Sequence, residues 1–339
     1  MPMRCPTCGA QYGDDARFCT KDGSKLALAA GTQRVTAGRE EGPSASASAR
    51  PAATSHANMA GQVLDRRYAI VKKVGEGGMS YVYLARDVST NERYAIKILS
   101  PALSKDENAM ARLRREAALG IRLAHPNVCH IVRMGETEDG LCYVVMPFVE
   151  GEILSDRNYR VGKTTLQDTA KFISEIADGL HVAHQLGIVH RDLKPENIMI
   201  CKRPTSGEEY AVVMDFGLAK ERKAGGELQK LTATGIILGT PEFMSPEQLR
   251  GKPLDPRTDI YSLALMTYEM LTAKLPFEGS NQQAMMIARL RAEPIPARNR
   301  RPELPEAVDR VLLKGMAREA NERFATAPEF AAALRAAIS

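Results

Sequence analysis

Tryptophan is absent from the 339-residue sequence, and aromatic residues make up only 5% of it. Base stacking on nucleic acid depends on such rings, and a net charge of +5 attracts polyanions only weakly, so we expect no nucleic-acid partner. No uncharged apolar run approaches the roughly 18 residues of a membrane helix, and the first residues lack the apolar stretch of a signal peptide. The six cysteines lack the spacing of a secreted disulfide framework. These absences predict a cytoplasmic protein without a membrane segment.

The composition changes twice along the chain. Residues 1–27 contain three of the six cysteines, whereas residues 28–61 consist largely of Ala, Ser, Gly, Thr and Pro. The second stretch buries too little apolar surface to offset the entropy of ordering it, so it is predicted to be a flexible linker. From residue 62 to residue 339 the composition is that of a folded domain.

The folded part begins with strands and continues with helices. Val-, Ile- and Tyr-rich runs between turn residues predict strands at Tyr68–Val74, Ser80–Asp87, Arg93–Leu99, Ile131–Gly135 and Cys142–Pro147. Apolar residues at three- and four-residue spacing predict helices around Leu113–Ile121 and at Leu166–Leu186, Asp259–Thr272, Asn281–Arg291, Pro305–Met316 and Ala327–Ala337. A small sheet-rich lobe (about residues 62–149) followed by a larger helical lobe (about residues 150–339) is a two-lobe α+β fold. A ligand is expected between the lobes.

A glycine-rich stretch, Gly75–Val82, lies between the first two predicted strands. Glycines let the backbone approach phosphate groups and turn N–H groups toward their oxygens. A dinucleotide-binding fold would continue with a helix here, and a P-loop would close with Gly-Lys-Ser/Thr, so neither fits. A phosphate-covering hairpin and a plain turn both remain open from this stretch alone.

Two charges on apolar faces form a second candidate feature. Lys97 faces the same side of its strand as Ala95, which is costly unless an anion meets it. Glu116 lies on the apolar face of the following helix and is positioned to supply that anion. We expect these residues to pair while the ammonium group of Lys97 stays able to contact phosphate.

The strongest signal is a polar cluster in the second half of the chain. Asp192, Lys194 and Asn197 offer a base, a cation and a neutral metal ligand within six residues, and Asp215 follows a short strand-like run. Mg²⁺ takes few oxygen ligands from protein and the rest from phosphate and water. A polar surface loop is the alternative, but the order and spacing of these residues together favour a magnesium–phosphate site.

Residues 62–339 thereby resemble the eukaryotic-like (Hanks-type) protein kinases, particularly the bacterial Ser/Thr branch. The resemblance rests on the glycine stretch, Lys97, Glu116, the His190–Asn197 and Asp215–Gly217 stretches, Ser245–Glu247, Asp259 and Arg323. It implies the bilobal protein-kinase fold and transfer of the ATP γ-phosphoryl group to protein Ser and Thr, with Mg²⁺, or Mn²⁺ as a substitute. Ser80 stands where the family usually has its third loop glycine.

The resemblance also implies a role for each site residue. Lys97, paired with Glu116, would hold the α- and β-phosphates, Asp192 would accept the substrate proton, and Lys194 would steady the γ-phosphoryl group. Asn197 and Asp215 would hold Mg²⁺. The ATP phosphates would be covered by Val74, Gly75, Glu76, Gly77, Gly78, Met79, Ser80, Tyr81 and Val82. Adenine would lie among Val82, Ala95 and Met199, with Met146 as gatekeeper and Pro147–Val149 as the hinge whose N–H donor is Val149.

Three further residues are predicted to support this site. Glu247 and Arg323 would form a buried ion pair in the large lobe. Asp259 would cap its helix, steady the catalytic-loop backbone, or both. A pseudokinase scaffold, which binds partners without catalysis, would be expected to lack Lys97, Asp192 or Asp215, and all three are present. A kinase fold that acts on small molecules is the other alternative, and Ser245–Glu247 favours protein substrates instead.

The N-terminal segment resembles a zinc ribbon, with Cys5 and Cys8 in one knuckle and Cys19 and Asp22 in the other. Four thiolates would make a strong tetrahedral site, whereas Asp22 as the fourth ligand is weaker. Zinc binding, a metal-free remnant and a redox role all remain open. The segment is expected to be a protein-interaction or oligomerisation module.

Regulation is predicted from Arg191, a cation directly before Asp192. Phosphate on Thr232 or Thr234 would add nearly two negative charges that could order its segment against Arg191. The resemblance implies that Thr240 instead contacts Asp192 and Lys194 without modification. We therefore expect trans-autophosphorylation at Thr232 and Thr234, through self-association. The protein substrate, the activating signal and the oligomeric state do not follow from the sequence.

Overall fold

The computed structural model describes residues 59–77, 80–104, 107–137, 140–216 and 241–338, except for a few side chains such as that of Glu116, and three short strands before residue 29. The chain divides into two compact units, residues 1–54 and 55–339. In the first unit, β1 (Met3–Arg4) pairs antiparallel with both β2 (Gln11–Tyr12) and β3 (Ala27–Leu28). The proposed zinc ligands Cys5, Cys8, Cys19 and Asp22 lie outside the described residues.

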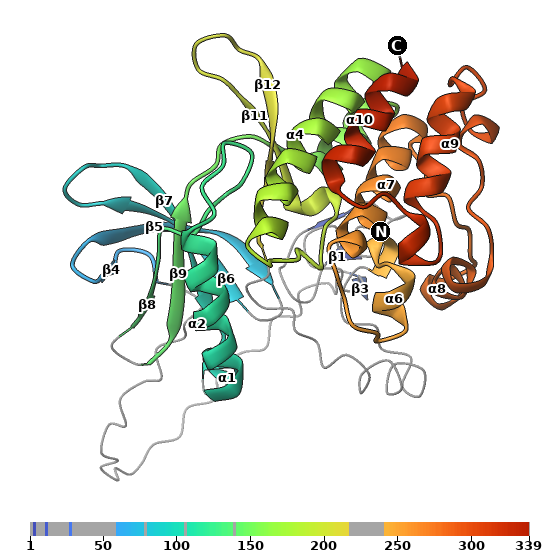
Figure 1. Ribbon diagram of the computed structural model, residues 1–339. Helices are drawn as coiled ribbons and strands as arrows, with labels where there is room; N and C mark the ends of the chain where they lie inside the picture. The colour runs from blue at the N-terminus through green and yellow to red at the C-terminus, as the bar shows by residue number, and fades with distance from the viewer. Residues whose placement is uncertain are drawn as a thin grey trace. The chain divides into compact units, whose positions relative to one another are not determined.

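The small lobe of the second unit is built on a six-stranded antiparallel sheet in the order β4-β5-β6-β7-β9-β8 (Figure 1). Its strands are β4 (Val63–Leu64), β5 (Tyr68–Gly77), β6 (Ser80–Asp87), β7 (Arg93–Leu99), β8 (Arg133–Glu136) and β9 (Cys142–Pro147). All five predicted strands are present, and β4 is additional. Strand β5 continues past Val74 because Gly75 and Glu76 pair with Val82 and Tyr81.

Alternation along β7 and β9 separates the two faces of this sheet. Tyr143 and Val145 enter a cluster that also buries Met59, whereas Val144 packs with α2 (Glu107–Ile121) on the other face. The short helix α1 (Pro101–Ser104) precedes α2. Because Met59 is only 6% exposed, the folded part begins slightly before residue 62, where the sequence places its start.

The large lobe is mainly helical. Its helices are α3 (Leu154–Val161), α4 (Leu166–Gln185), α6 (Pro246–Leu249), α7 (Arg257–Thr272), α8 (Gln282–Arg291), α9 (Glu306–Gly315) and α10 (Ala327–Ile338). Single 3₁₀ turns are η1 (Pro195–Asn197), η2 (Pro241–Phe243), η3 (Ala297–Asn299) and η4 (Ala320–Glu322). A small antiparallel sheet consists of β10 (Glu152–Ile153), β11 (Ile198–Lys202) and β12 (Glu209–Val213). The five helices predicted in this lobe are confirmed, with ends shifted by at most two residues.

Helix α7 is the centre of this lobe, since it is buried on nearly all sides and packs against α4, α9 and α10 (Figure 1). A side chain at Gly315 would come within 2.8 Å of the Ala264 Cβ, so glycine allows α9 to approach α7 closely. Thr165 and Asn281 cap α4 and α8 by accepting backbone N–H groups. None of the helices in the described ranges is long and apolar enough to cross a membrane.

Candidate active site

Asp259 on α7 binds the backbone of the loop between α4 and β11. The fully buried Asp259 carboxylate accepts hydrogen bonds from the backbone N–H groups of His190 (2.8 Å) and Arg191 (2.9 Å). Arg191 has φ of +64°, an unfavourable conformation for a residue with a side chain, and its carbonyl accepts from Gln248 Nε2 at 2.6 Å. The predicted steadying role of Asp259 is confirmed. It does not cap α7, whose N-cap residue is Pro256.

Two histidines complete this support, and the sequence analysis assigned a role to neither. His184 on α4 lies 2.8 Å from Asp259 through its Nε2 atom. His190 Nε2 lies 2.8 Å from the carbonyl oxygen of Met214, and its ring packs edge-on against Phe216 at 4.8 Å. His190 thereby ties the loop to the segment that carries Asp215. His184 has no sequence signal beyond a polar residue on an apolar helix, because its partner is 75 residues away.

Asp192 is oriented within this loop by Asn197. The Asn197 Nδ2 atom donates to the Asp192 carbonyl oxygen at 2.7 Å and to its carboxylate Oδ2 at 3.0 Å. Lys194 Nζ lies 3.8 Å from the same Oδ2 atom. The Asp192 side chain is 19% exposed, so an incoming hydroxyl can reach it. The arrangement holds the carboxyl group in a fixed position, as a general base requires.

Lys97 and Asp215 join the two lobes across this site. Lys97 Nζ donates to Asp215 Oδ1 at 2.8 Å, although the residues are 118 positions apart. The side chain of Lys97 is 10% exposed and that of Asp215 is 41% exposed, so the aspartate compensates a largely buried ammonium group. The predicted partner Glu116 lies on α2, but its side chain is outside the described part of the structure.

The residues predicted to contact adenine come together in one apolar cluster. It contains Ala95, Met146, Cys129, Cys201 and Val212, with Val82, Phe148, Val149, Met199, Tyr210 and Met214 packed against them. Pro147 is opposite Tyr94 at the end of β9. Burial raises the pKa of the Cys129 thiol to about 12 and that of Cys201 to about 11, so neither supplies a thiolate nucleophile here. Gly78 and Met79 lie outside the described residues.

Oxygen donors suited to Mg²⁺ lie at the polar side of this site. Asn197 uses its Nδ2 atom toward Asp192, so its Oδ1 atom takes no part in that contact, and Asp215 adds a carboxylate group that is 41% exposed. Two such ligands fit Mg²⁺, which completes its shell with water and phosphate. No group of three or more His, Cys, Asp or Glu suited to a metal occurs among the residues described. Thr232, Thr234 and Thr240 lie outside that part of the chain.

The predicted Glu247–Arg323 ion pair is confirmed in the large lobe. Arg323 Nη1 and Nη2 donate to Glu247 Oε1 and Oε2 at 2.7 and 2.8 Å, and Thr258 Oγ1 also donates to Oε1. Burial alone would raise the pKa of Glu247, but Arg323 and Thr258 outweigh it, and the pKa is lowered.

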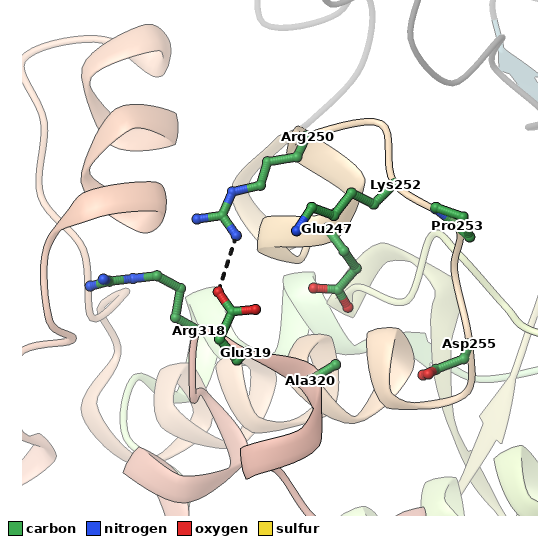
Figure 2. Close-up of a pocket in the computed structure, with 8 residues that line it drawn as sticks. All are labelled: Glu247, Arg250, Lys252, Pro253, Asp255, Arg318, Glu319 and Ala320. Carbon is green, nitrogen blue, oxygen red and sulfur yellow. Dashed lines mark hydrogen bonds and ion pairs between the residues drawn. The ribbon is translucent and has the colours of Figure 1, made fainter.

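A hollow of about 200 Å³ lies beside this pair (Figure 2). Its lining comes from residues 247–255 and 318–320, with the Arg250–Glu319 ion pair on one side. None of the residues predicted to bind ATP lines it, so this hollow is separate from the Lys97–Asp192 site.

Comparison with known proteins gives a consistent result. Residues 68–332 match the family model described as "Protein kinase domain". The chain is 36% identical over 279 residues to the serine/threonine-protein kinase pkn3 of Myxococcus xanthus, covering 81% of this chain and 51% of that protein. It is 37% identical over 276 residues to PknB of Mycolicibacterium smegmatis, covering 80% and 43%. The chain thus spans about half the length of the curated relatives it matches. The crystal structure of the Mycobacterium tuberculosis PknI kinase domain matches with a TM-score of 0.65 at 26% identity, covering 83% of this chain and 100% of that one.

Proposed function

The chain belongs to the protein kinase domain family, and from this premise we propose that it transfers the γ-phosphoryl group of ATP to Ser and Thr hydroxyls of proteins. The observation that carries the proposal is the convergence of two pairs, Lys97 with Asp215 and Asp192 with Asn197. Phosphoryl transfer asks a protein mainly to position the reactants and to neutralise charge. These pairs supply a cation, oxygen ligands and an oriented base.

Each group has one task in the proposed reaction. The acceptor hydroxyl oxygen forms a bond to the γ-phosphorus, the bond from that phosphorus to the β-phosphate oxygen breaks, and ADP leaves. Asp192, held by Asn197, accepts the hydroxyl proton. Lys194 neutralises charge on the transferring group, and Lys97 contacts the α- and β-phosphates. Mg²⁺, when bound by Asn197 and Asp215, would neutralise phosphate charge.

The test is transfer of ³²P from [γ-³²P]ATP to a generic basic protein, followed by phosphoamino-acid analysis. Wild type should label Ser and Thr, and Asp192→Asn should lose nearly all labelling because it removes the base but keeps the side-chain size. A folded wild type that labels no protein would favour a scaffold. Labelling of small-molecule alcohols alone would favour a kinase of another substrate class.

We also propose that the chain activates itself by trans-autophosphorylation at Thr232 and Thr234. Support comes from the sequence, which places Lys220, Arg222 and Lys223 in the same segment as these threonines, and from Arg191 beside Asp192. A phosphate group adds charge and acceptor oxygens that arginine binds well. Phosphopeptide mapping after incubation with Mg-ATP should find both sites, and the double alanine variant should lose most activity. An active enzyme with both threonines unmodified would refute this proposal.

For the N-terminal segment we propose a zinc site made by Cys5, Cys8, Cys19 and Asp22. Support comes from the knuckle-like spacing of the three cysteines, since thiolate is a preferred ligand of Zn²⁺.

A further inference from the structure

Helix α7 holds both the catalytic loop and residues 241–245, the segment from η2 to the residue before α6. Ser262 Oγ on α7 donates to the carbonyl oxygen of Phe243 at 2.8 Å, one turn after Asp259 on the same helix. Ser245 caps α6 through a capping box with Gln248, and Gln248 in turn donates to the Arg191 carbonyl. The position of this segment is therefore coupled to the residue that precedes Asp192.

Arg289 on α8 also contacts this segment. Its Nη1 atom donates to the carbonyl oxygen of Met244 at 3.3 Å, and the residue is only 2% exposed. By contrast Arg291, two positions further along the same helix, is exposed. A buried guanidinium group needs anionic or polar partners, because burial removes the water that would otherwise hydrate its charge. The Arg289 side chain is thus buried between α8 and residues 241–245.

Glu242, within the same segment, supplies the nearby negative charge. Burial lowers the pKa of Arg289, while electrostatic interactions with Tyr261 and with the Glu242 carboxylate act in the opposite direction. The Glu242 Oε2 atom is buried and has no hydrogen-bond partner among the described residues. Replacing Arg289 by a neutral residue would therefore leave the buried Oε2 atom of Glu242 without this nearby positive charge. Removing the charge of Glu242 as well should offset part of the resulting loss of stability.

A protein substrate is much larger than its acceptor hydroxyl, so the residues beside that hydroxyl must rest on the surface next to Asp192. Residues 241–245 are next to that position, because Gln248 links them to Arg191. We propose that Arg289 is a positioning residue for the protein substrate, which fixes residues 241–245 in the conformation that receives the chain flanking the acceptor hydroxyl. The inference rests on the proposed function, since only a protein substrate needs such a surface.

The test compares Arg289→Lys and Arg289→Leu with Arg291→Leu, the exposed control on the same helix. Steady-state kinetics with a Ser/Thr peptide should show a peptide KM raised roughly tenfold in both Arg289 variants, the scale of one lost hydrogen bond from a charged donor. The KM for ATP should stay within about twofold, because Lys97 and the apolar cluster are untouched. The control should match wild type in both constants.

A double variant separates positioning from folding. Glu242→Gln with Arg289→Leu removes both buried charges, so it should recover thermal stability lost in Arg289→Leu yet keep the raised peptide KM. An unchanged peptide KM in Arg289→Lys, or a KM that returns to wild type together with stability in the double variant, overturns the inference. If wild-type protein transfers phosphate to no peptide at all, the proposed function itself fails and the inference falls with it.

Discussion

Asp259, fully buried on α7, accepts a 2.9 Å hydrogen bond from the backbone N–H of Arg191, the residue that precedes Asp192. Arg191 has a left-handed φ of +64°. This conformation costs about 1–3 kcal/mol and persists only where the surrounding structure enforces it. Asp259 and Gln248 together hold both backbone polar groups of Arg191. The strain is thus stored next to the proposed catalytic base and is balanced by a helix in the core.

We expect Asp259→Asn to lower kcat by roughly 10- to 100-fold and stability by about 2–4 kcal/mol. The amide offers one acceptor oxygen where the carboxylate now serves His184, His190 and Arg191. The KM for ATP should change little. Kinetics and thermal unfolding measure both effects, with Asp255→Asn as the exposed control. A stable variant with full kcat would show that the loop keeps its conformation without this carboxylate.

Much of this fold was predictable because long apolar patterns determine long elements. Strands β6, β7 and β9 have the predicted bounds, and α7 begins two residues before its predicted start. Helix α3 was not predicted, because its sequence LSDRNYRV is mostly polar and its buried residues are only Leu154 and Asn158. Short strands such as β4 also lack a pattern long enough to detect, since pairing with β5 rather than propensity defines them.

The contacts of the candidate site also differ in how far the sequence predicts them. Asp192 and Asn197 are five positions apart, so the sequence predicted that they share a loop, whereas the hydrogen bond between them was not predicted. The Lys97–Asp215 contact spans 118 positions and depends on how the lobes pack, which no local pattern encodes. His184 and Gln248 were missed for this reason, because each acts only through a distant partner.

Lys97→Met should lower phosphoryl transfer at least tenfold while the protein stays folded. Methionine has similar length and suits the apolar surroundings of β7, and Asp215, which loses this ion pair, is 41% exposed to water. Radiolabel transfer and thermal unfolding measure the two effects, with the exposed Lys202→Met as control. Retention of more than about a tenth of wild-type turnover would argue against a phosphate contact by Lys97.

Arg323→Leu should destabilise the large lobe by about 3–5 kcal/mol, since it leaves the Glu247 carboxylate buried without its guanidinium partner. Arg310→Leu, which breaks the exposed pair with Glu306, should cost about 1 kcal/mol or less. Because the pKa of Glu247 is lowered in the folded state, the contribution of the pair should persist at neutral pH and be lost only as pH falls below the usual carboxylate range. Denaturant unfolding at several pH values tests this. Similar losses in the two variants would contradict a special role for the buried pair.

Protein purified without chelators should contain about one zinc ion per chain if the N-terminal cysteines bind it. Cys5→Ser or Cys8→Ser should remove the metal, whereas Asp22→Cys should tighten binding, because thiolate suits this borderline-soft ion better than carboxylate. Metal analysis by mass spectrometry measures the content, with Asp14→Asn as a control in the same segment. Metal-free wild type would favour a remnant that no longer binds zinc.

Glu269 on α7 is a carboxyl group whose burial disfavours its charged form. Burial, opposed by a hydrogen bond from Asn158 and reinforced by the charge of Glu196, raises the pKa of Glu269 to about 7. Asn158 Nδ2 donates to Glu269 Oε2 at 3.2 Å, while the Asn158 Oδ1 atom is buried without a hydrogen-bond partner among the described residues. Burial outweighs the hydrogen bond from Asn158, so this site favours the neutral acid more than water does.

The stability of the protein should therefore fall as pH rises from about 4.5 to about 7, in so far as Glu269 controls it. In this interval the folded state keeps the Glu269 proton that the unfolded chain has released, so the folded state binds more protons and loses stability with rising pH. Glu269→Gln should be more stable than wild type by about 1–3 kcal/mol at pH 8 and nearly equal to it at pH 4.5. Denaturant unfolding across this range, with the exposed Glu322→Gln as control, measures the difference. A constant offset between Glu269→Gln and wild type at every pH would mean that packing, and not titration of Glu269, separates them.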